Sequence, residues 1–157
     1  MSQLKRALLT VSALTILMFY SGLSLAHEHK QEEDNVAVEN AWARATFALA
    51  KTGAVYLSID NQSGHKLKLL SVSVDSTVAS DAQLHETLME EEVMQMREVT
   101  NGFEIASGST LEFLPGGKHV MLMGLEKPLI TGEQFVLSLT FENRKVMRVP
   151  IEVKDAR

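Results

Sequence analysis

From residue 36 onward the chain consists of short runs in which apolar and polar residues alternate, each ended by turn-forming residues. Alternation with a period of two puts successive side chains on opposite faces of a strand, so these runs predict β-strands with one buried face. No long stretch of this region shows the 3.6-residue period of an amphipathic helix. Strands are expected at residues 36–42, 53–60, 67–74, 83–89, 93–99, 110–114, 119–123, 134–141 and 145–153.

Turn chemistry between these runs indicates how they are joined. Asn101-Gly102 and Pro115-Gly116 carry the residue types that favour tight turns. Short strands with regularly spaced turns predict an all-β fold, an antiparallel β-sandwich of the Greek-key kind. Pro150 has no N–H to donate to a neighbouring strand, so the last strand is expected at a sheet edge or bulged at that residue.

The first 26 residues have a different composition from the rest. Lys5 and Arg6 precede an uncharged run over residues 7–20, and Ser24-Leu25-Ala26 supplies small residues at its exit. This order predicts a secretory signal peptide over 1–26, an N-terminal signal helix cleaved after Ala26, and a periplasmic protein. The alternative is an uncleaved membrane anchor, because the apolar run is almost long enough to span a bilayer. Residues 27–35 are predicted to be a disordered polar lead-in, and 36–157 the folded domain.

The chain contains no cysteine. An exported protein of this kind has no disulfides, so its packed core must hold the fold. Thiolate catalysis, iron–sulfur clusters, the thiolate-ligated blue-copper centre and a lipid-bearing cysteine are all excluded. Loss of Lys5 and Arg6 with the signal peptide changes the formal charge from −5 to −7, which disfavours binding to nucleic acid.

Methionine is concentrated in one part of the sequence. Of the eight methionines, five lie within 35 residues: Met89, Met94, Met96, Met121 and Met123. By strand alternation, His85 shares a face with Met89, and Met94 shares a face with Met96. A hairpin closed at Glu90-Glu91 would place His85 directly opposite Met96, although a change in loop length would shift this register.

A second segment repeats the pairing of histidine with methionine. In His119-Val120-Met121 the imidazole and the thioether point to the same side of a strand. Neutral imidazoles and thioethers suit a soft, singly charged ion, so His85, Met96, His119 and Met121 are predicted to bind one Cu(I). Met89 is a candidate secondary ligand. Met94 and Met123 are interpreted as residues that fill gaps in the core.

The predicted mature N-terminus offers another metal site. Cleavage after Ala26 would leave a free amine, two backbone amides and an imidazole in the sequence His27-Glu28-His29, a square-planar nitrogen set suited to Cu(II) or Ni(II). His27 and His29 are therefore candidate secondary metal residues. The alternative is that this segment is only a polar tail.

These motifs resemble the PCu(A)C family of periplasmic copper chaperones. The family has a His, a Met about ten residues on, and a His-x-Met about twenty further; here ten residues separate His85 from Met96, and twenty-two separate Met96 from His119. Matching text covers AWARAT at 41–46, GAVYLSIDN at 53–61, VMQMREV at 93–99 and LPGGKHVMLMGL at 114–125. The chain departs from the family in the hairpin turn, where Glu90-Glu91-Glu92 replaces the frequent Asp-Gly or Asn-Gly.

The resemblance implies a cupredoxin-like sandwich and Cu(I) transport. It also implies delivery to the CuA centre of cytochrome c oxidase, with the oxidase copper subunit and a Sco-type thioredoxin-like protein as partners. We expect a monomeric carrier rather than an enzyme, without a stable membrane anchor after cleavage. The alternatives are a metal-free β-sandwich interaction module and a binder that serves general periplasmic copper tolerance.

Overall fold

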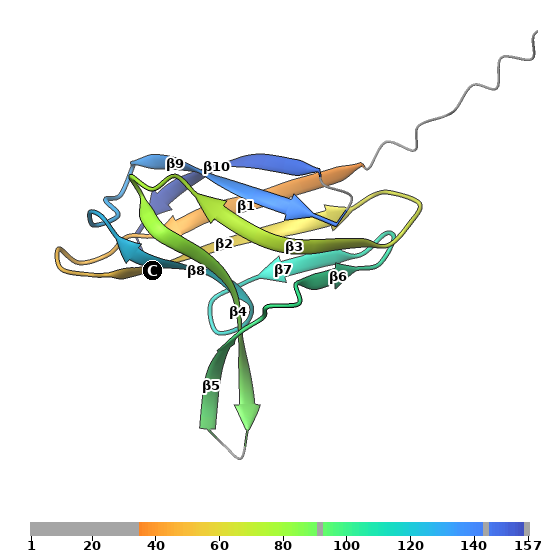
Figure 1. The fold of residues 1–157 in the computed structure, drawn as a ribbon, viewed down its shortest axis with the longest axis horizontal. Coiled ribbons are helices and arrows are strands. Elements are labelled where there is room, and N and C mark those ends of the chain that lie inside the picture. The colour runs from red at the N-terminus through yellow and green to blue at the C-terminus, as the bar shows by residue number, and fades with distance from the viewer. Residues whose placement is uncertain (1–34, 91–92, 143–144, 156–157) are drawn as a thin grey trace, which may run out of the picture. The chain divides into compact units, whose positions relative to one another are not determined.

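The computed structural model describes residues 35–90, 93–142 and 145–155, which form ten β-strands (Figure 1). The strands are β1 (Val36–Arg44), β2 (Thr52–Asn61), β3 (Leu67–Val74), β4 (Ala79–Glu90), β5 (Val93–Glu98), β6 (Phe103–Ile105), β7 (Thr110–Phe113), β8 (His119–Leu125), β9 (Gln134–Phe141) and β10 (Val146–Lys154). The predicted signal peptide, most of the predicted lead-in, and His27 and His29 lie outside the described residues. Within the described part of the chain, no helix has the length and apolar content needed to cross a membrane.

All ten strands belong to one hydrogen-bonded sheet. Its order is β5-β4-β8-β2-β1-β10-β9-β3-β6, and β7 pairs with β2 beyond the stretch that β8 occupies. The prediction of an all-β fold is confirmed, but the prediction of a wholly antiparallel sheet is wrong. β1 and β10 run parallel, with Ala43 paired to Val153. A parallel pair needs a long crossover connection, and here the whole intervening domain supplies it.

Two details of the strand prediction are also corrected. The three-residue β6 was missed, because three residues are too few to show an alternating pattern. Pro150 does not mark an edge, since β10 lies between β1 and β9. The proline is tolerated because pairing of β10 with β1 is confined to residues 152–154, so no β1 partner is required at residue 150.

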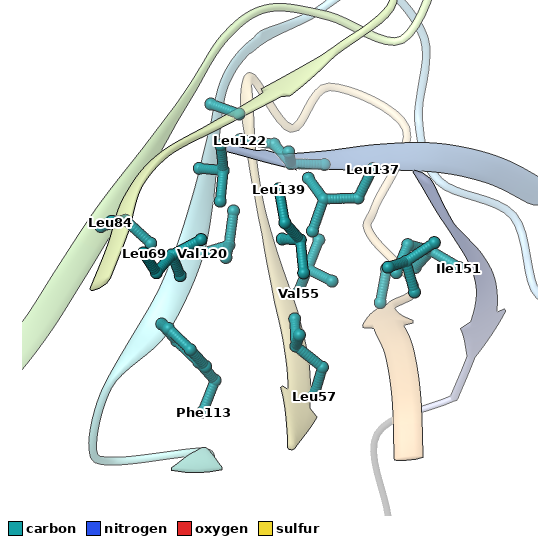
Figure 2. Close-up of a cluster of buried hydrophobic side chains, with 14 of the residues drawn as sticks. Val55, Leu57, Leu69, Leu84, Phe113, Val120, Leu122, Leu137, Leu139 and Ile151 are labelled. Atoms are coloured by element: carbon teal, nitrogen blue, oxygen red, sulfur yellow. The ribbon is translucent and has the colours of Figure 1, made fainter. Parts of the chain in front are cut away.

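One hydrophobic cluster lies inside the sheet, and the alternating pattern explains which residues enter it. Strands far apart in the sheet order contribute to the same cluster: Leu84 of β4 and Val120 of β8 lie with Leu69 of β3 and Leu137 of β9 (Figure 2). The sheet must therefore fold over on itself so that both of its ends cover one core. Burial of this apolar surface is the main term stabilising a fold that has no disulfide.

The hairpin formed by β4 and β5 is an exception to this arrangement. Every strand contributes at least one residue to the core cluster except β5, whose six residues are all exposed. In Figure 1 the far half of β4 and all of β5 project away from the body of the sheet. Residues 88–90 of β4 and 93–95 of β5 therefore form a two-stranded ribbon with solvent on both faces.

Candidate metal site

The outer face of β4 and β8 brings the predicted histidines together. Val120 and Leu122 of β8 are buried in the core, so His119, Met121 and Met123 point to the opposite side of the strand. On β4, Ala82 and Leu84 are buried, and Gln83 and His85 lie on the same outer face as the β8 residues with which they pair. The same alternation that builds the core thus selects which side chains form the site.

His85 and His119 are directly paired across β4 and β8. Their ring centroids are 5.8 Å apart, with the ring planes inclined at 40°. Two imidazoles that share one ion at a metal–nitrogen distance of about 2 Å have centroids about 5–6 Å apart. The pair is therefore already spaced for one ion. We refer to these two residues as the histidine row.

The tight turn between β7 and β8 orients His119. The amide of Gly117 donates to the carbonyl of Leu114 at 3.0 Å, and Gly116 adopts a φ of 81°, a conformation that residues with a Cβ disfavour. The Gly117 carbonyl then accepts a hydrogen bond from His119 Nδ1 at 3.1 Å. Because a carbonyl can only accept, Nδ1 carries the proton and Nε2 of the neutral ring keeps its lone pair for a metal.

His85 has the complementary arrangement. Its Nε2 lies 3.1 Å from Oε1 of Gln83, an acceptor, so Nε2 carries the proton and the lone pair is on Nδ1. That Nδ1 is buried and has no hydrogen-bond partner among the described residues. An unpaired buried acceptor costs about 1–3 kcal/mol, and a bound metal ion would satisfy it.

Burial and a neighbouring charge favour the neutral form of His85. Desolvation is the largest cause that lowers the pKa of His85, and the positive charge that His119 can carry lowers it further. The carboxylate of Glu98 acts in the opposite direction. A lowered pKa keeps the imidazole in the form that binds metal.

The structure corrects the predicted hairpin register. His85 pairs with Glu98, and Met96 pairs with Thr87, because the hairpin closes between Glu90 and Val93 rather than at Glu90-Glu91. The shift is two residues, so Met96 stays on the outer face but is diagonal to His85. Glu98 therefore occupies the position beside the histidine row that the sequence analysis gave to Met96.

Met121 lies on the other side of the histidine row. It pairs with Gln83 on β4 and with Ala54 on β2, and its side chain is half-buried. It also borders an open groove of about 330 Å³ whose lining includes Arg44 and Tyr56. The thioether is thus fixed beside the histidines but can be approached from solvent.

The other methionines of this region differ from the prediction in which of them are buried and which are exposed. Met94 was interpreted as a residue that fills a gap in the core, but it is 60% exposed on the projecting hairpin. Met89, the candidate secondary ligand, is its direct cross-strand partner and is 67% exposed. Met123 is half-buried on the outer face of β8. The core-filling interpretation of Met94 fails because β5 has no core beneath it.

Two polar residues of the site were missed by sequence reasoning. Gln83 holds Nε2 of His85, and Glu98 lies opposite the same histidine. Parity along the strands would have placed both on the outer face, but only the register identifies them as neighbours of His85. Among the described residues, no three His, Asp or Glu side chains gather as a metal site.

Sequence comparisons match this chain to a family described as lipoproteins. Residues 36–153 match the family model described as "LpqE-like: Putative lipoprotein LpqE-like". The chain is 32% identical over 160 residues to "Putative lipoprotein Lxx21020" of Leifsonia xyli subsp. xyli (strain CTCB07), covering 99% of this chain and 94% of that protein.

Two solved structures of copper-bound proteins have a similar fold. The copper-bound PCuAC domain from PmoF2 superposes with a TM-score of 0.62 over 77% of this chain and 93% of that domain; at 19% identity, this likeness shows the fold. The Cu(I) form of DR1885 from Deinococcus radiodurans is 27% identical, with a TM-score of 0.52 over 73% of this chain and 75% of that one.

Proposed function

Because this chain belongs to the LpqE-like family, which is the PCuAC family, we propose that it carries one Cu(I) ion on the histidine row outside the cytoplasm. The observation that carries the proposal is the buried Nδ1 of His85, which has no hydrogen-bond partner in the described part of the chain, in a ring whose centroid lies 5.8 Å from that of His119. The sequence motif and the 27%-identical structural relative in its Cu(I) form support it. The same membership favours describing the folded-over sheet as a cupredoxin-like Greek-key sandwich.

The proposed ligands are His85 Nδ1, His119 Nε2 and the sulfurs of Met121 and Met96. Each imidazole has one ring nitrogen engaged in a hydrogen bond and the other available to a metal, which is the usual arrangement of metal-binding histidines. Met121 is the next outward residue along β8 after His119, and Met96 lies on β5 opposite Thr87, two pairs beyond His85 on the same face. Two nitrogen and two soft sulfur donors, none of them charged, favour Cu(I) over Mg²⁺ or Ca²⁺.

A carrier role follows from how the site is built. Bound copper would contact side chains on an open sheet face beside a groove, where an acceptor's ligands can replace the thioethers one at a time. A catalytic site would need an open metal position together with a positioned acid or base. The polar neighbours of the row, Gln83 and Glu98, are engaged with or opposite His85, which fits orientation of the ligand.

Family membership is also the basis for proposing where the copper goes and which partners take part. We propose export through a signal peptide over residues 1–26 and delivery toward the CuA centre of cytochrome c oxidase, with a Sco-type protein taking part. The relatives' lipoprotein names support a location outside the cytoplasm, although none of the 157 residues here is a cysteine that could carry a lipid. His27 and His29 are proposed to bind Cu(II) after cleavage.

Anaerobic titration of the protein with Cu(I) against a competing chelator tests the proposal. The protein should withdraw one tightly held Cu(I), and the His85→Asn/His119→Asn variant should lose it while keeping its far-UV circular dichroism spectrum and melting temperature. Asparagine retains an N–H donor at each position, so the fold has no new unpaired acceptor to accommodate. A parent protein that binds no Cu(I) would instead support the metal-free interaction module.

Transfer is tested by mixing the loaded protein with an apo CuA domain and measuring the CuA visible absorption under an oxidant.

A further inference from the structure

The β4–β5 hairpin carries its own set of thioethers apart from the histidine row. Met89 pairs directly with Met94, and Met96 is the next outward residue along β5 on the same face. Direct cross-strand partners have Cβ atoms about 5 Å apart, and diagonal neighbours are about 7–8 Å apart. A methionine side chain spans most of such a gap, so three sulfurs on this face can meet at one ion.

The core cannot account for these residues. Met89, Met94 and Met96 are exposed by 67%, 60% and 54%, on a hairpin whose outer strand contributes nothing to the hydrophobic cluster. Figure 1 shows this part of the molecule standing away from the rest of the sheet. Exposed apolar side chains gathered on one face of a projecting element indicate a binding role.

The composition of the face favours a metal over a protein partner. Among the described residues, only three of the exposed large apolar side chains are methionines, and all three lie on this face; the other exposed large apolar residues are Phe, Leu, Ile and Val. A docking surface would accept any of these apolar types, whereas ligation of a soft ion requires sulfur. The opposite face of the hairpin carries Leu88 and Val93 together with an ion pair between Arg97 and Glu90.

Charge near the hairpin also favours a cation. Residues 86–98 contain five glutamates and one arginine, a formal charge of −4. Carboxylates at this density raise the local concentration of cations, while the thioethers select a soft one.

We propose that Met89, Met94 and Met96 form a second Cu(I) site made only of thioethers, at the tip of the β4–β5 hairpin. The inference rests on the proposed function, since it gives the carrier a second copper site next to the one at the histidine row. Met96 belongs to both ligand sets: it binds the ion at the histidine row when one ion is bound, and the ion at the hairpin site when two are bound. The position of Met96 is two residues from that of His85, about 7 Å along the strand.

Ag(I), a soft ion of the same charge that does not change oxidation state, serves as the probe. The number of ions bound per chain is counted by native mass spectrometry, and the ε-methyl groups of ¹³C-labelled methionine are followed by NMR. The Met89→Leu/Met94→Leu variant should bind one Ag(I) fewer than the parent, and the Met89 and Met94 methyl signals of the parent should shift on loading. Leucine conserves the volume of these exposed side chains, so the fold is retained.

The matched control is Met123→Leu/Met147→Leu, which removes two thioethers elsewhere and should bind as many ions as the parent. Equal numbers of ions in the parent and in Met89→Leu/Met94→Leu would overturn the hairpin site, as would equal losses in the test and control variants. His85→Asn/His119→Asn separates this inference from the proposed function. If that variant loses an ion and Met89→Leu/Met94→Leu does not, the carrier stands and the hairpin site falls; the reverse leaves the hairpin site and removes the carrier.

Discussion

The histidine row and the methionine face of the hairpin lie on the same side of β4 but are built on different principles. The row sits on the body of the sheet, where His119 is 5% exposed and both imidazoles are held by hydrogen bonds to Gly117 and Gln83. The methionines stand on a ribbon without a core, exposed by half or more. One region provides fixed nitrogen donors, and the other provides sulfur donors on mobile side chains.

The difference shows how affinity and exchange can be separated in one molecule. Pre-oriented ligands lose little freedom on binding, so they favour a tightly held ion. Flexible, unbranched methionines adapt to many geometries but must be ordered for each ion they hold. We therefore expect the row to determine how tightly copper is kept, and the hairpin to influence how it arrives or leaves.

The largest expected effect comes from removing the row itself. His85→Asn/His119→Asn should weaken the tightest Cu(I) site by more than about 100-fold, since loss even of an outer partner of a metal ligand costs about 10–100-fold. Competition with a Cu(I) chelator under anaerobic conditions measures this. The comparison of the two regions breaks if Met89→Leu/Met94→Leu weakens the tightest site as much as the histidine variant does.

The next largest effect distinguishes two methionines on one strand. Met121 and Met123 share the outer face of β8, but only Met121 is the nearest residue to His119 on that face of the strand. Met121→Leu should lower Cu(I) affinity by about 10–100-fold, while Met123→Leu should leave it unchanged. Equal affinities in the two variants would show that Met121 is not a ligand. Melting temperatures of both should stay near the parent, because leucine matches methionine in volume.

The sequence predicted which side chains share a strand face more reliably than which ones meet. Alternation alone grouped His119 with Met121 and Met94 with Met96, and parity survives any two-residue error. The register does not follow from alternation, because it depends on where the Glu90–Glu92 turn closes. Hence Met96 was placed opposite His85, where the structure has Glu98.

The pairing of strands that are far apart in the sequence also could not be predicted from local sequence patterns. The pairing of β1 with β10 joins segments more than 100 residues apart, and nothing in either strand identifies the other as a parallel partner. The exposure of Met94 was mispredicted for a related reason, since an apolar residue in a strand gives no information on whether a second layer covers it. Tertiary packing decides both.

A smaller effect is expected at the residue that orients His85. Gln83→Leu removes the acceptor for Nε2–H, so the ring loses its preference for the tautomer with a lone pair on Nδ1. Cu(I) affinity should fall by no more than about tenfold, the lower end of the range for such outer partners. Gln95→Leu, an exposed position on the opposite face of β5, is the matched control and should have no effect. A Gln83→Leu protein with parent affinity would show that the histidine row is oriented by packing alone.

The smallest effect is a shift in protonation of His85 in the metal-free protein. Burial lowers the pKa of His85, a charged His119 lowers it further, and Glu98 opposes both. The His85 signals in an NMR pH titration should therefore show a pKa below the value of about 6.5 for free histidine, and in Glu98→Gln the pKa should be lower still. Because the unfolded chain then binds more protons than the folded one, the stability contributed by this group is present above pH of about 6.5 and is lost as the pH falls through the folded pKa. Urea unfolding at pH 7 and at pH 5 checks the sign, with greater stability expected at pH 7. A His85 pKa at or above that of free histidine would mean that burial does not control the ring, and the contrast between a buried row and an exposed hairpin would lose its physical basis.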